Sequence, residues 1–231
     1  MRIVVLTGAG ISAESGVPTF RGPDGLWEGH RIEDVATPEG FEADPGTVQA
    51  FYDARRRSLA SVAPNAAHRA LARLEGAIGD ELLVVTQNVD DLHERAGSRR
   101  LVHMHGELRR SLCMGCGARP DWDGDLIDRP ACPECGERML RPDVVWFGEM
   151  PYELGRIEQA VVACDVFVSI GTSGEVYPAA GYVALAAAFG ARTVELNLEP
   201  SDPAVPFDDA RAGRAGELVS AWVDEVIAAR S

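Results

Sequence analysis

The chain has 231 residues, of which 36 are acidic and 22 are basic, so its formal net charge is −14. A surface of this charge argues against sequence-independent or sequence-specific nucleic-acid binding and favours basic partners such as lysine-rich protein segments. The hydrophobic content of 46% can fill the core of one α/β unit, and no apolar run approaches the length of a membrane span. We therefore expect a cytoplasmic protein that does not enter a membrane.

The first predicted strand covers residues 2–6, where the apolar run 3–6 is typical of a central parallel strand. The next residues, GAGISA at 8–13, fit the fingerprint in which small residues let the backbone approach a dinucleotide pyrophosphate. A tight strand-to-helix turn would also use these glycines. Residues 15–18, SGVP, should end any helix early, and residues 19–25 read as a loop. This order suits a dinucleotide that is cleaved as a substrate better than one that carries hydride.

Two further predicted strands, residues 82–86 and 101–103, deliver polar residues at their carboxyl ends. The first is followed by Gln87, Asn88 and Asp90, at the edge where ligands bind in open α/β sheets. The second brings His103 and His105 at alternate positions, which point to one face of a strand. An imidazole is a natural base near neutral pH, although a structural, hydrogen-bonded histidine is the alternative.

Four of the five cysteines form two C-x-x-C pairs separated by fifteen residues. The spacing indicates a tetrahedral zinc site, and four thiolates would close the coordination shell, so the metal should be structural. Two disulfides or four unrelated thiols are the alternatives. The expected ligands are Cys113, Cys116, Cys132 and Cys135.

Strands are also expected at residues 165–170 and 192–197, and helices at 66–74, 182–189 and 217–229. This alternation predicts a parallel sheet with helices on both faces. Two insertions interrupt it, one at about residues 30–61 that should be helical and one at about 107–141 that contains the cysteines.

Seven motifs together resemble the sirtuin family of NAD-dependent protein-lysine deacylases. They occur in the family's order over nearly the whole chain: GAGISAESG at 8–16, TQNVD at 86–90, HMHG at 103–106, the paired C-x-x-C motifs, RPDVVWFGE at 141–149, GTS at 171–173 and NLE at 197–199. The resemblance is to the class III bacterial and archaeal members that remove succinyl and malonyl groups.

The resemblance implies a Rossmann-like NAD-binding domain and a small domain beside it, with the cofactor and the acyl-lysine meeting in the cleft between them. We assign residues 1–29, 62–106 and 142–231 to the large domain. The small domain then combines the helical module 30–61 with the zinc-ribbon module 107–141.

The resemblance also implies that NAD is consumed and that one structural zinc ion is bound. Catalysis would use His105 as the general base and Asn88 beside the nicotinamide, and yield free lysine and 2′-O-acyl-ADP-ribose. The residues expected to contact NAD are Gly8, Ala9, Gly10, Ile11, Glu14, Thr19, Phe20, Arg21, Trp27, Gln87, Asn88, Asp90, Gly171, Thr172, Ser173, Asn197, Leu198, Glu199 and Ala215.

The substrate would be an acylated, lysine-containing protein held by backbone pairing. Two segments should flank the peptide, through Val145, Phe147, Gly148 and Glu149 on one side and Glu175 and Val176 on the other. Tyr52 and Arg55 lie three residues apart and would share a helix face, where a guanidinium and a phenol can bind a terminal carboxylate. A solvated run of arginines is the alternative reading of this segment.

Other functions remain open from the sequence. An ADP-ribosyltransferase would cleave NAD but use another acceptor, and an acetyl-preferring deacetylase would lack specificity for acidic acyl groups. A binding module without turnover and an ordinary NAD dehydrogenase are further alternatives.

Overall fold

The computed structural model describes residues 1–19, 27, 29–201 and 205–230. These residues form a six-stranded parallel sheet with the strand order β3-β2-β1-β6-β7-β8. The strands are β1 (Ile3–Thr7), β2 (Leu82–Thr86), β3 (Leu101–His103), β6 (Val166–Ile170), β7 (Arg192–Asn197) and β8 (Asp209–Ala212). Without β4 and β5, which belong to a separate sheet, this is the 3-2-1-4-5-6 order of the Rossmann fold. Successive strands are added on one side of β1 as far as β3 and on its other side from β6 onward. Such folds bind dinucleotides at this switch point between β1 and β6.

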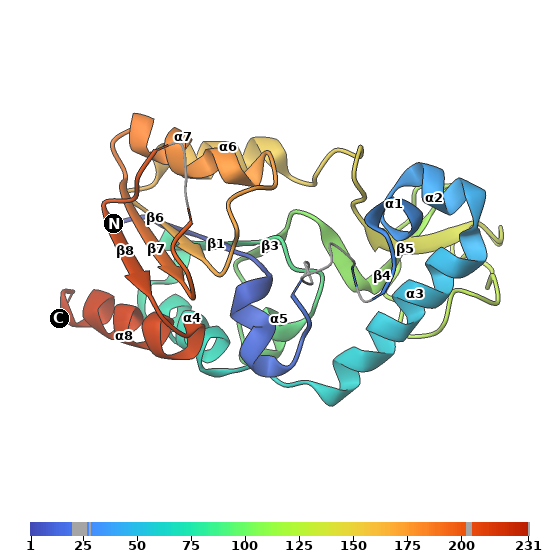
Figure 1. The fold of residues 1–231 in the computed structure, drawn as a ribbon, viewed down its shortest axis with the longest axis horizontal. Coiled ribbons are helices and arrows are strands. Elements are labelled where there is room, and N and C mark those ends of the chain that lie inside the picture. Colours follow the sequence, from blue (N-terminus) through green and yellow to red (C-terminus); the bar gives the residue numbers. More distant parts are fainter. Residues whose placement is uncertain (20–26, 28, 202–204, 231) are drawn as a thin grey trace.

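Helices cover both faces of this sheet, as the alternation of the sequence predicts (Figure 1). One face packs against α4 (Ala66–Ile78) and α8 (Ala215–Ala228), and the other against α6 (Leu154–Ala163) and α7 (Tyr182–Ala188). Residues 3–6 of β1 are apolar because they fill the cores on both faces of the sheet. Ile3 and Val5 pack on the side of α4 and α8, whereas Val4 and Leu6 pack on the side of α6 and α7.

Short elements connect these layers. They are the 3₁₀ segments η1 (Ala9–Ser15), η3 (Gly79–Glu81) and η4 (Ala179–Gly181) and the helix α5 (Leu92–Ala96). The predicted early stop after the glycine turn is confirmed, because η1 ends at Gly16, which has a φ of 88°. Only glycine adopts this left-handed conformation without strain.

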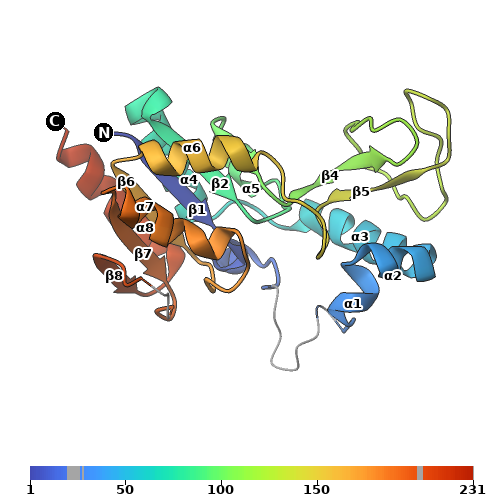
Figure 2. The ribbon, with the colours of Figure 1, turned by 90° about the horizontal axis from the view of Figure 1, so that it is seen from above.

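The two insertions lie together at the end of the molecule away from the C-terminus (Figure 2). The first contains α1 (Ile32–Val35), α2 (Pro38–Ala43), α3 (Pro45–Ser58) and η2 (Leu59–Ser61). The second is bounded by the antiparallel pair β4 (Gly106–Cys113) and β5 (Leu140–Val144). This agrees with the expected helical module and cysteine-containing module, while the domain boundaries assigned from the sequence stay a prediction.

One face of α3 joins these two modules. Gln49 donates to the Leu140 carbonyl (2.9 Å), and the buried Asp53 carboxylate accepts the backbone N–H groups of Leu126 and Ile127. Asp53 also pairs with Arg56 at 2.7 Å. Helix α3 is therefore held in place by the loop that carries the cysteines.

Among the described residues, every helix is too short or too polar to cross a bilayer.

Candidate active site

The glycine turn after β1 lies against the turn after β6. Gly8 N–H donates to the Ile170 carbonyl (3.0 Å), and Gly10 N–H donates to the Gly171 carbonyl (2.8 Å). A Cβ atom on Gly10 would stand 2.7 Å from the Gly171 Cα, too close for any side chain. The glycines are thus required by the contact between two main chains at the sheet's switch point. The remaining predicted members of the turn are Ala9, half-buried, and Ile11, buried.

Polar contacts link the turn after β6 to the end of β7, and the glycine turn to the start of α8. Thr172 receives a hydrogen bond from Gln87 Nε2 on its hydroxyl (3.0 Å) and one from Asn197 Nδ2 on its carbonyl (2.9 Å). Glu14 accepts the Gly216 N–H at the start of α8 (2.8 Å), next to Ala215. These bonds bring together residues that lie 85, 25 and 202 positions apart in the sequence. Ser173, Leu198 and Glu199 are exposed on the adjoining loops.

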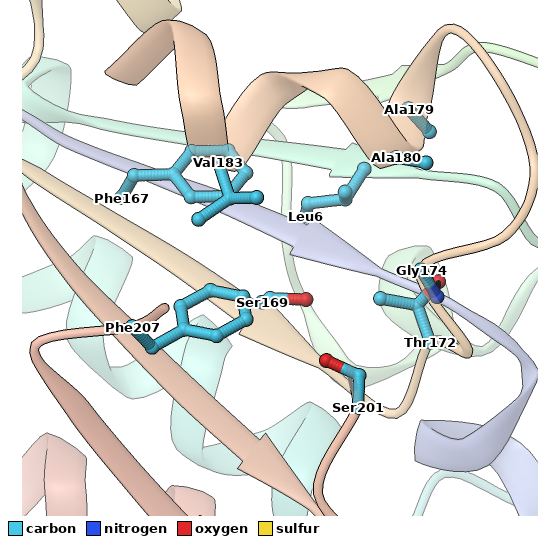
Figure 3. Close-up of a pocket in the computed structure, with 10 residues that line it drawn as sticks. All are labelled: Leu6, Phe167, Ser169, Thr172, Gly174, Ala179, Ala180, Val183, Ser201 and Phe207. Carbon is cyan, nitrogen blue, oxygen red and sulfur yellow. Dashed lines mark hydrogen bonds between the residues drawn. The ribbon is translucent and has the colours of Figure 1, made fainter. Parts of the chain in front are cut away.

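A pocket lies beside the loop that follows β6, on the α7 side of the sheet (Figure 3). Leu6, Phe167 and Phe207 form apolar walls, and Thr172 and Gly174 lie at its rim. Of the predicted NAD contacts that the structure describes, only Thr172 lines it. The pocket is therefore a neighbour of the predicted cofactor site and not the site itself.

The loop after β2 carries Asn88 and Asp90 into a buried hydrogen-bond network. Asn88 Nδ2 donates to the Gly8 carbonyl (3.1 Å) and to Ser12 Oγ (3.2 Å), while Ser12 Oγ donates to Asp90 Oδ2 (3.0 Å). Burial raises the pKa of Asp90. Ser12, which the site prediction omitted, ties the glycine turn to both residues, and its place within the GAGIS motif was the available signal.

His105 lies just beyond β3, beside this network. Its Nδ1 donates to the Gln87 carbonyl (3.2 Å), and since a carbonyl only accepts, Nε2 is the basic nitrogen. Burial lowers the pKa of His105. The imidazole is therefore neutral at pH 7, as a general base must be.

Tyr52 and Arg55 share a buried face of α3, as their spacing predicts. Tyr52 is fully buried, Arg55 is 9% exposed, and the Arg55 guanidinium carbon lies 4.3 Å from the centre of the Trp27 ring. Trp146 Nε1 donates to the Tyr52 hydroxyl oxygen (3.0 Å). The solvated-arginine alternative is thus wrong for Arg55. Trp146 was not among the predicted site residues, because a contact across 94 positions leaves no local pattern.

Trp27, predicted to contact NAD, lies in the same aromatic cluster as Tyr52 and Phe51. Thr19 is exposed at the edge of the described residues. Phe20 and Arg21 lie outside the described residues.

One predicted peptide-binding segment follows β5. Val145 N–H donates to the His105 carbonyl (2.9 Å), so this segment starts beside the candidate base. Phe147 and Gly148 are exposed, whereas Glu149 accepts from Arg141 Nη2 (2.7 Å) and from the Trp146 N–H (2.9 Å). The Glu149 carboxylate therefore holds the turn together.

The second predicted segment follows the GTS motif. Glu175 is exposed there and Val176 is half-buried.

The four cysteines converge on one point of the ribbon. Their sulfur atoms lie within 4.8 Å of one another, with Sγ–Sγ distances of 3.7 Å for Cys113 and Cys135 and 3.9 Å for Cys116 and Cys132. Tetrahedral zinc with Zn–S bonds of about 2.3 Å requires sulfurs about 3.8 Å apart. All four are free thiols, so the disulfide alternative is wrong and the donor set fits one structural zinc ion.

Comparison with known proteins agrees with this geometry. Residues 8–178 match the model of the Sir2 family. The chain is 57% identical over 230 residues to an "NAD-dependent protein deacylase" of Pasteurella multocida (strain Pm70), with 98% of each chain covered. It is 55% identical over 229 residues to a protein of the same name from Escherichia coli (strain K12), covering 98% of this chain and 82% of that one.

Solved structures give the same result. A "Sir2 homolog-NAD complex" superposes with a TM-score of 0.90 at 42% identity, covering 100% of this chain and 91% of that chain. A Sir2 homologue mutant in complex with 2′-O-acetyl ADP ribose has a TM-score of 0.89 at 40% identity, covering 100% of this chain and 93% of the other. The chain belongs to the Sir2 family.

Proposed function

We propose that this chain, an NAD-dependent protein deacylase, accepts lysine residues bearing succinyl or malonyl groups, in addition to acetyl-lysine. The observation that carries the proposal is the buried face of α3, which presents both Tyr52 and Arg55, the latter with its guanidinium stacked on the Trp27 ring. A buried guanidinium can recognise a carboxylate through paired, charge-assisted hydrogen bonds, which a lysine ammonium or a neutral group would not reproduce.

The position of this pair relative to the candidate base supports the same proposal. Val89, between Asn88 and Asp90, packs against the cluster that contains Tyr52, and Leu108 N–H donates to the Val89 carbonyl (2.8 Å). The hydrogen-bond network around Asn88 and the aromatic cluster around Tyr52 therefore lie next to each other, joined through Val89. An acyl-lysine with its amide near Asn88 would direct its acyl chain toward α3.

The cofactor residues would divide along the sheet edge. Gly8 and Gly10 carry no side chain and would let the pyrophosphate approach the main chain closely, and Asn88 and Asp90 would face the nicotinamide. The adenosine end would lie near Asn197. Bound NAD supplies a ribose carbon that becomes electrophilic when nicotinamide leaves. We assign ten further predicted cofactor contacts to the walls of this same site: Ala9, Ile11, Glu14, Gln87, Gly171, Thr172, Ser173, Leu198, Glu199 and Ala215.

His105 would act as the general base through Nε2. Its Nδ1 bond to the Gln87 carbonyl orients the ring, and its lowered pKa keeps Nε2 unprotonated at neutral pH. It would take a proton from a ribose hydroxyl, which makes the oxygen nucleophilic. Asn88 and the buried Asp90 would exclude water from the reacting centre and supply fixed dipoles there.

The peptide would lie extended along Val145 and Phe147, whose segment begins at the His105 carbonyl. Glu175 and Val176 would flank its other side. Backbone pairing of this kind recognises an extended chain with few demands on its sequence. The net charge of −14 favours lysine-rich, basic segments as substrates.

The test is Arg55→Met, assayed with matched succinyl- and acetyl-lysine peptides and NAD. The variant leaves the acyl carboxylate buried without its charged partner, which costs on the order of 3–5 kcal/mol. Desuccinylation efficiency should then fall by roughly a hundred-fold or more. Deacetylation should persist, because an acetyl group carries no carboxylate, so the ratio of the two activities is the readout.

Arg57→Met is the matched control. Arg57 is on the same helix, but its side chain is 57% exposed and pairs with Asp125 at 2.6 Å. It should leave the activity ratio unchanged. If both activities fall together in Arg55→Met, or if the wild type prefers acetyl-lysine outright, the proposed acyl specificity is wrong. Mass analysis of the product separates deacylation from ADP-ribosyl transfer.

A further inference from the structure

The loop after β2 is held by an uninterrupted series of hydrogen bonds. Each of the four carbonyls of residues 86–89 accepts a bond from the segment 103–108. The pairs are Thr86 with Met104 N–H, Gln87 with His105 Nδ1, Asn88 with His103 Nδ1, and Val89 with Leu108 N–H. The outer two bonds are made by backbone groups, which most residue types could supply. The inner two depend on histidine side chains.

His103 differs from His105 in what its second nitrogen contacts. Its Nδ1 lies 3.0 Å from the Asn88 carbonyl, and its Nε2 lies 2.6 Å from Glu94 Oε1 on α5. A carbonyl and a carboxylate both only accept, so both ring nitrogens of His103 carry protons. The imidazolium is 8% exposed and donates from both sides. Charge-assisted bonds of this kind are shorter and stronger than neutral ones.

The two histidines, two residues apart, therefore differ in their partners, and their pKa values shift in opposite directions. Burial alone would lower the pKa of His103, but the hydrogen bond and charge of Glu94, together with the charge of Glu107 and the Asn88 carbonyl, outweigh it and raise the pKa. The pKa of His105 is lowered by burial, and no carboxylate opposes the effect. His103, which donates from both ring nitrogens, is suited to hold the main chain in place, whereas His105, with Nε2 unprotonated, is suited to exchange a proton.

We infer that His103, clamped by Glu94, is a positioning residue for Asn88. The inference rests on the proposed function, in which the Asn88 amide is part of the reacting centre. The Asn88 side chain bonds to Gly8 and Ser12 at 3.1 and 3.2 Å, so a shift of its main chain would misplace the amide. Misplacement of a reacting group by about 1 Å can reduce turnover by up to a hundred-fold.

Two substitutions of His103 separate this role from a merely structural one. An asparagine amide nitrogen is as many bonds from Cα as Nδ1, so His103→Asn keeps a donor for the Asn88 carbonyl. A glutamine amide nitrogen corresponds to Nε2, so His103→Gln keeps the reach to Glu94 and loses the bond to Asn88. Glu94→Gln keeps an acceptor oxygen and removes the charge.

The readouts are kcat, the peptide KM, the Kd for ADP-ribose and the melting temperature. In His103→Gln we expect kcat to fall on the order of ten-fold, with KM and the ADP-ribose Kd within about two-fold of wild type. His103→Asn should retain kcat within about three-fold, and Glu94→Gln should lie between the two. Glu158→Gln, at an exposed position on α6, is the control for loss of a carboxylate and should match wild type.

The reverse order, with His103→Gln more active than His103→Asn, would show that His103 serves only to anchor α5. Equal kcat losses in the two variants, or losses that follow the melting temperature, would also overturn the inference. The kcat values are compared on whichever acyl-lysine peptide the wild type cleaves. A wild type that cleaves acetyl-lysine but not succinyl-lysine therefore refutes the proposed specificity, while the order of the His103 variants is still measured.

Discussion

Two ion pairs that differ in burial lie where helix α3 meets the cysteine-containing module. Asp53 and Arg56 pair at 2.7 Å with both side chains 1% exposed. One residue further along, Arg57 pairs with Asp125 at 2.6 Å, with side chains 57% and 41% exposed. The first pair lies within α3 and reaches the module through backbone groups of Leu126 and Gly124, whereas the second connects α3 to Asp125 directly. Removing one carboxylate from each pair therefore compares a buried with an exposed contact at the same junction.

Removing the buried carboxylate should destabilise the protein strongly. In Asp53→Ala, the Arg56 guanidinium keeps only the carbonyls of Leu108 and Gly124 as partners, and the N–H groups of Leu126 and Ile127 lose their acceptor. An uncompensated buried charge costs about 3–5 kcal/mol in the free energy of unfolding. The orphaned N–H groups act in the same direction. For Asp125→Ala we expect less than about 1 kcal/mol, because both partners are exposed.

Urea unfolding of the zinc-loaded protein, followed by circular dichroism, measures both variants against wild type. Tyr52 and Arg55 lie on the same helix as Asp53. When the Asp53→Ala variant is heated, we therefore expect it to lose desuccinylation activity at a lower temperature than it loses ADP-ribose binding. If the two alanine variants differ by less than about 1 kcal/mol in unfolding free energy, the buried pair does not fix α3 and the reasoning fails.

Three further outcomes follow from the same structure. Removal of zinc by a chelator should release about one ion per chain and lower the melting temperature, because metal binding and ribbon folding are coupled; a metal-free sample with an unchanged melting temperature would contradict this. His105→Ala should abolish deacylation and leave the Kd for ADP-ribose nearly unchanged, since the glycine turn is intact, and normal turnover would show that the base lies elsewhere. The pKa of His105 is lowered from 6.5 by burial, and the free imidazole is the active form. The acid limb of kcat/KM for wild type should therefore lie below pH 6.5, and a limb centred above 7 would refute the assignment.

The strands of the large sheet could be predicted from the sequence because each is buried between two helical layers. Residues 82–86, 101–103 and 192–197 were expected as strands, and the structure has them at the same bounds. Helix α4 extends beyond its predicted end at residue 74, because Ile78 still packs into the core. Strand β8 was missed. Its sequence, DARA, carries two charges and only alternate residues are partly buried, so its strand conformation depends on pairing with β7.

The candidate site shows the same division between local and long-range information. The glycine turn and the cysteine pairs are recognisable because their chemistry needs particular residues at short spacings. The bond from Trp146 to Tyr52 and the bond from His103 to the Asn88 carbonyl depend on how separate segments meet. His103 was noticed in the sequence only as the partner of His105 on one strand face. Its role could be inferred only once Glu94 and the Asn88 carbonyl were placed on either side of its ring.

Helix α3 connects the features that the sequence presents as unrelated. Tyr52 and Arg55 contribute to the aromatic cluster, while Gln49, Asp53 and Arg56 hold the module that contains the cysteines. Once the four cysteine thiolates bind zinc, the metal has no open coordination position at which a reaction could occur. Its effect on acyl recognition must therefore be mechanical, through the loop that accepts α3. In the proposed function the NAD pyrophosphate would bind instead at the edge of the large sheet, although Trp27, another predicted NAD contact, packs against Phe51 and Arg55 of α3. Loss of zinc should consequently impair recognition of the acyl group before it impairs binding of the nucleotide.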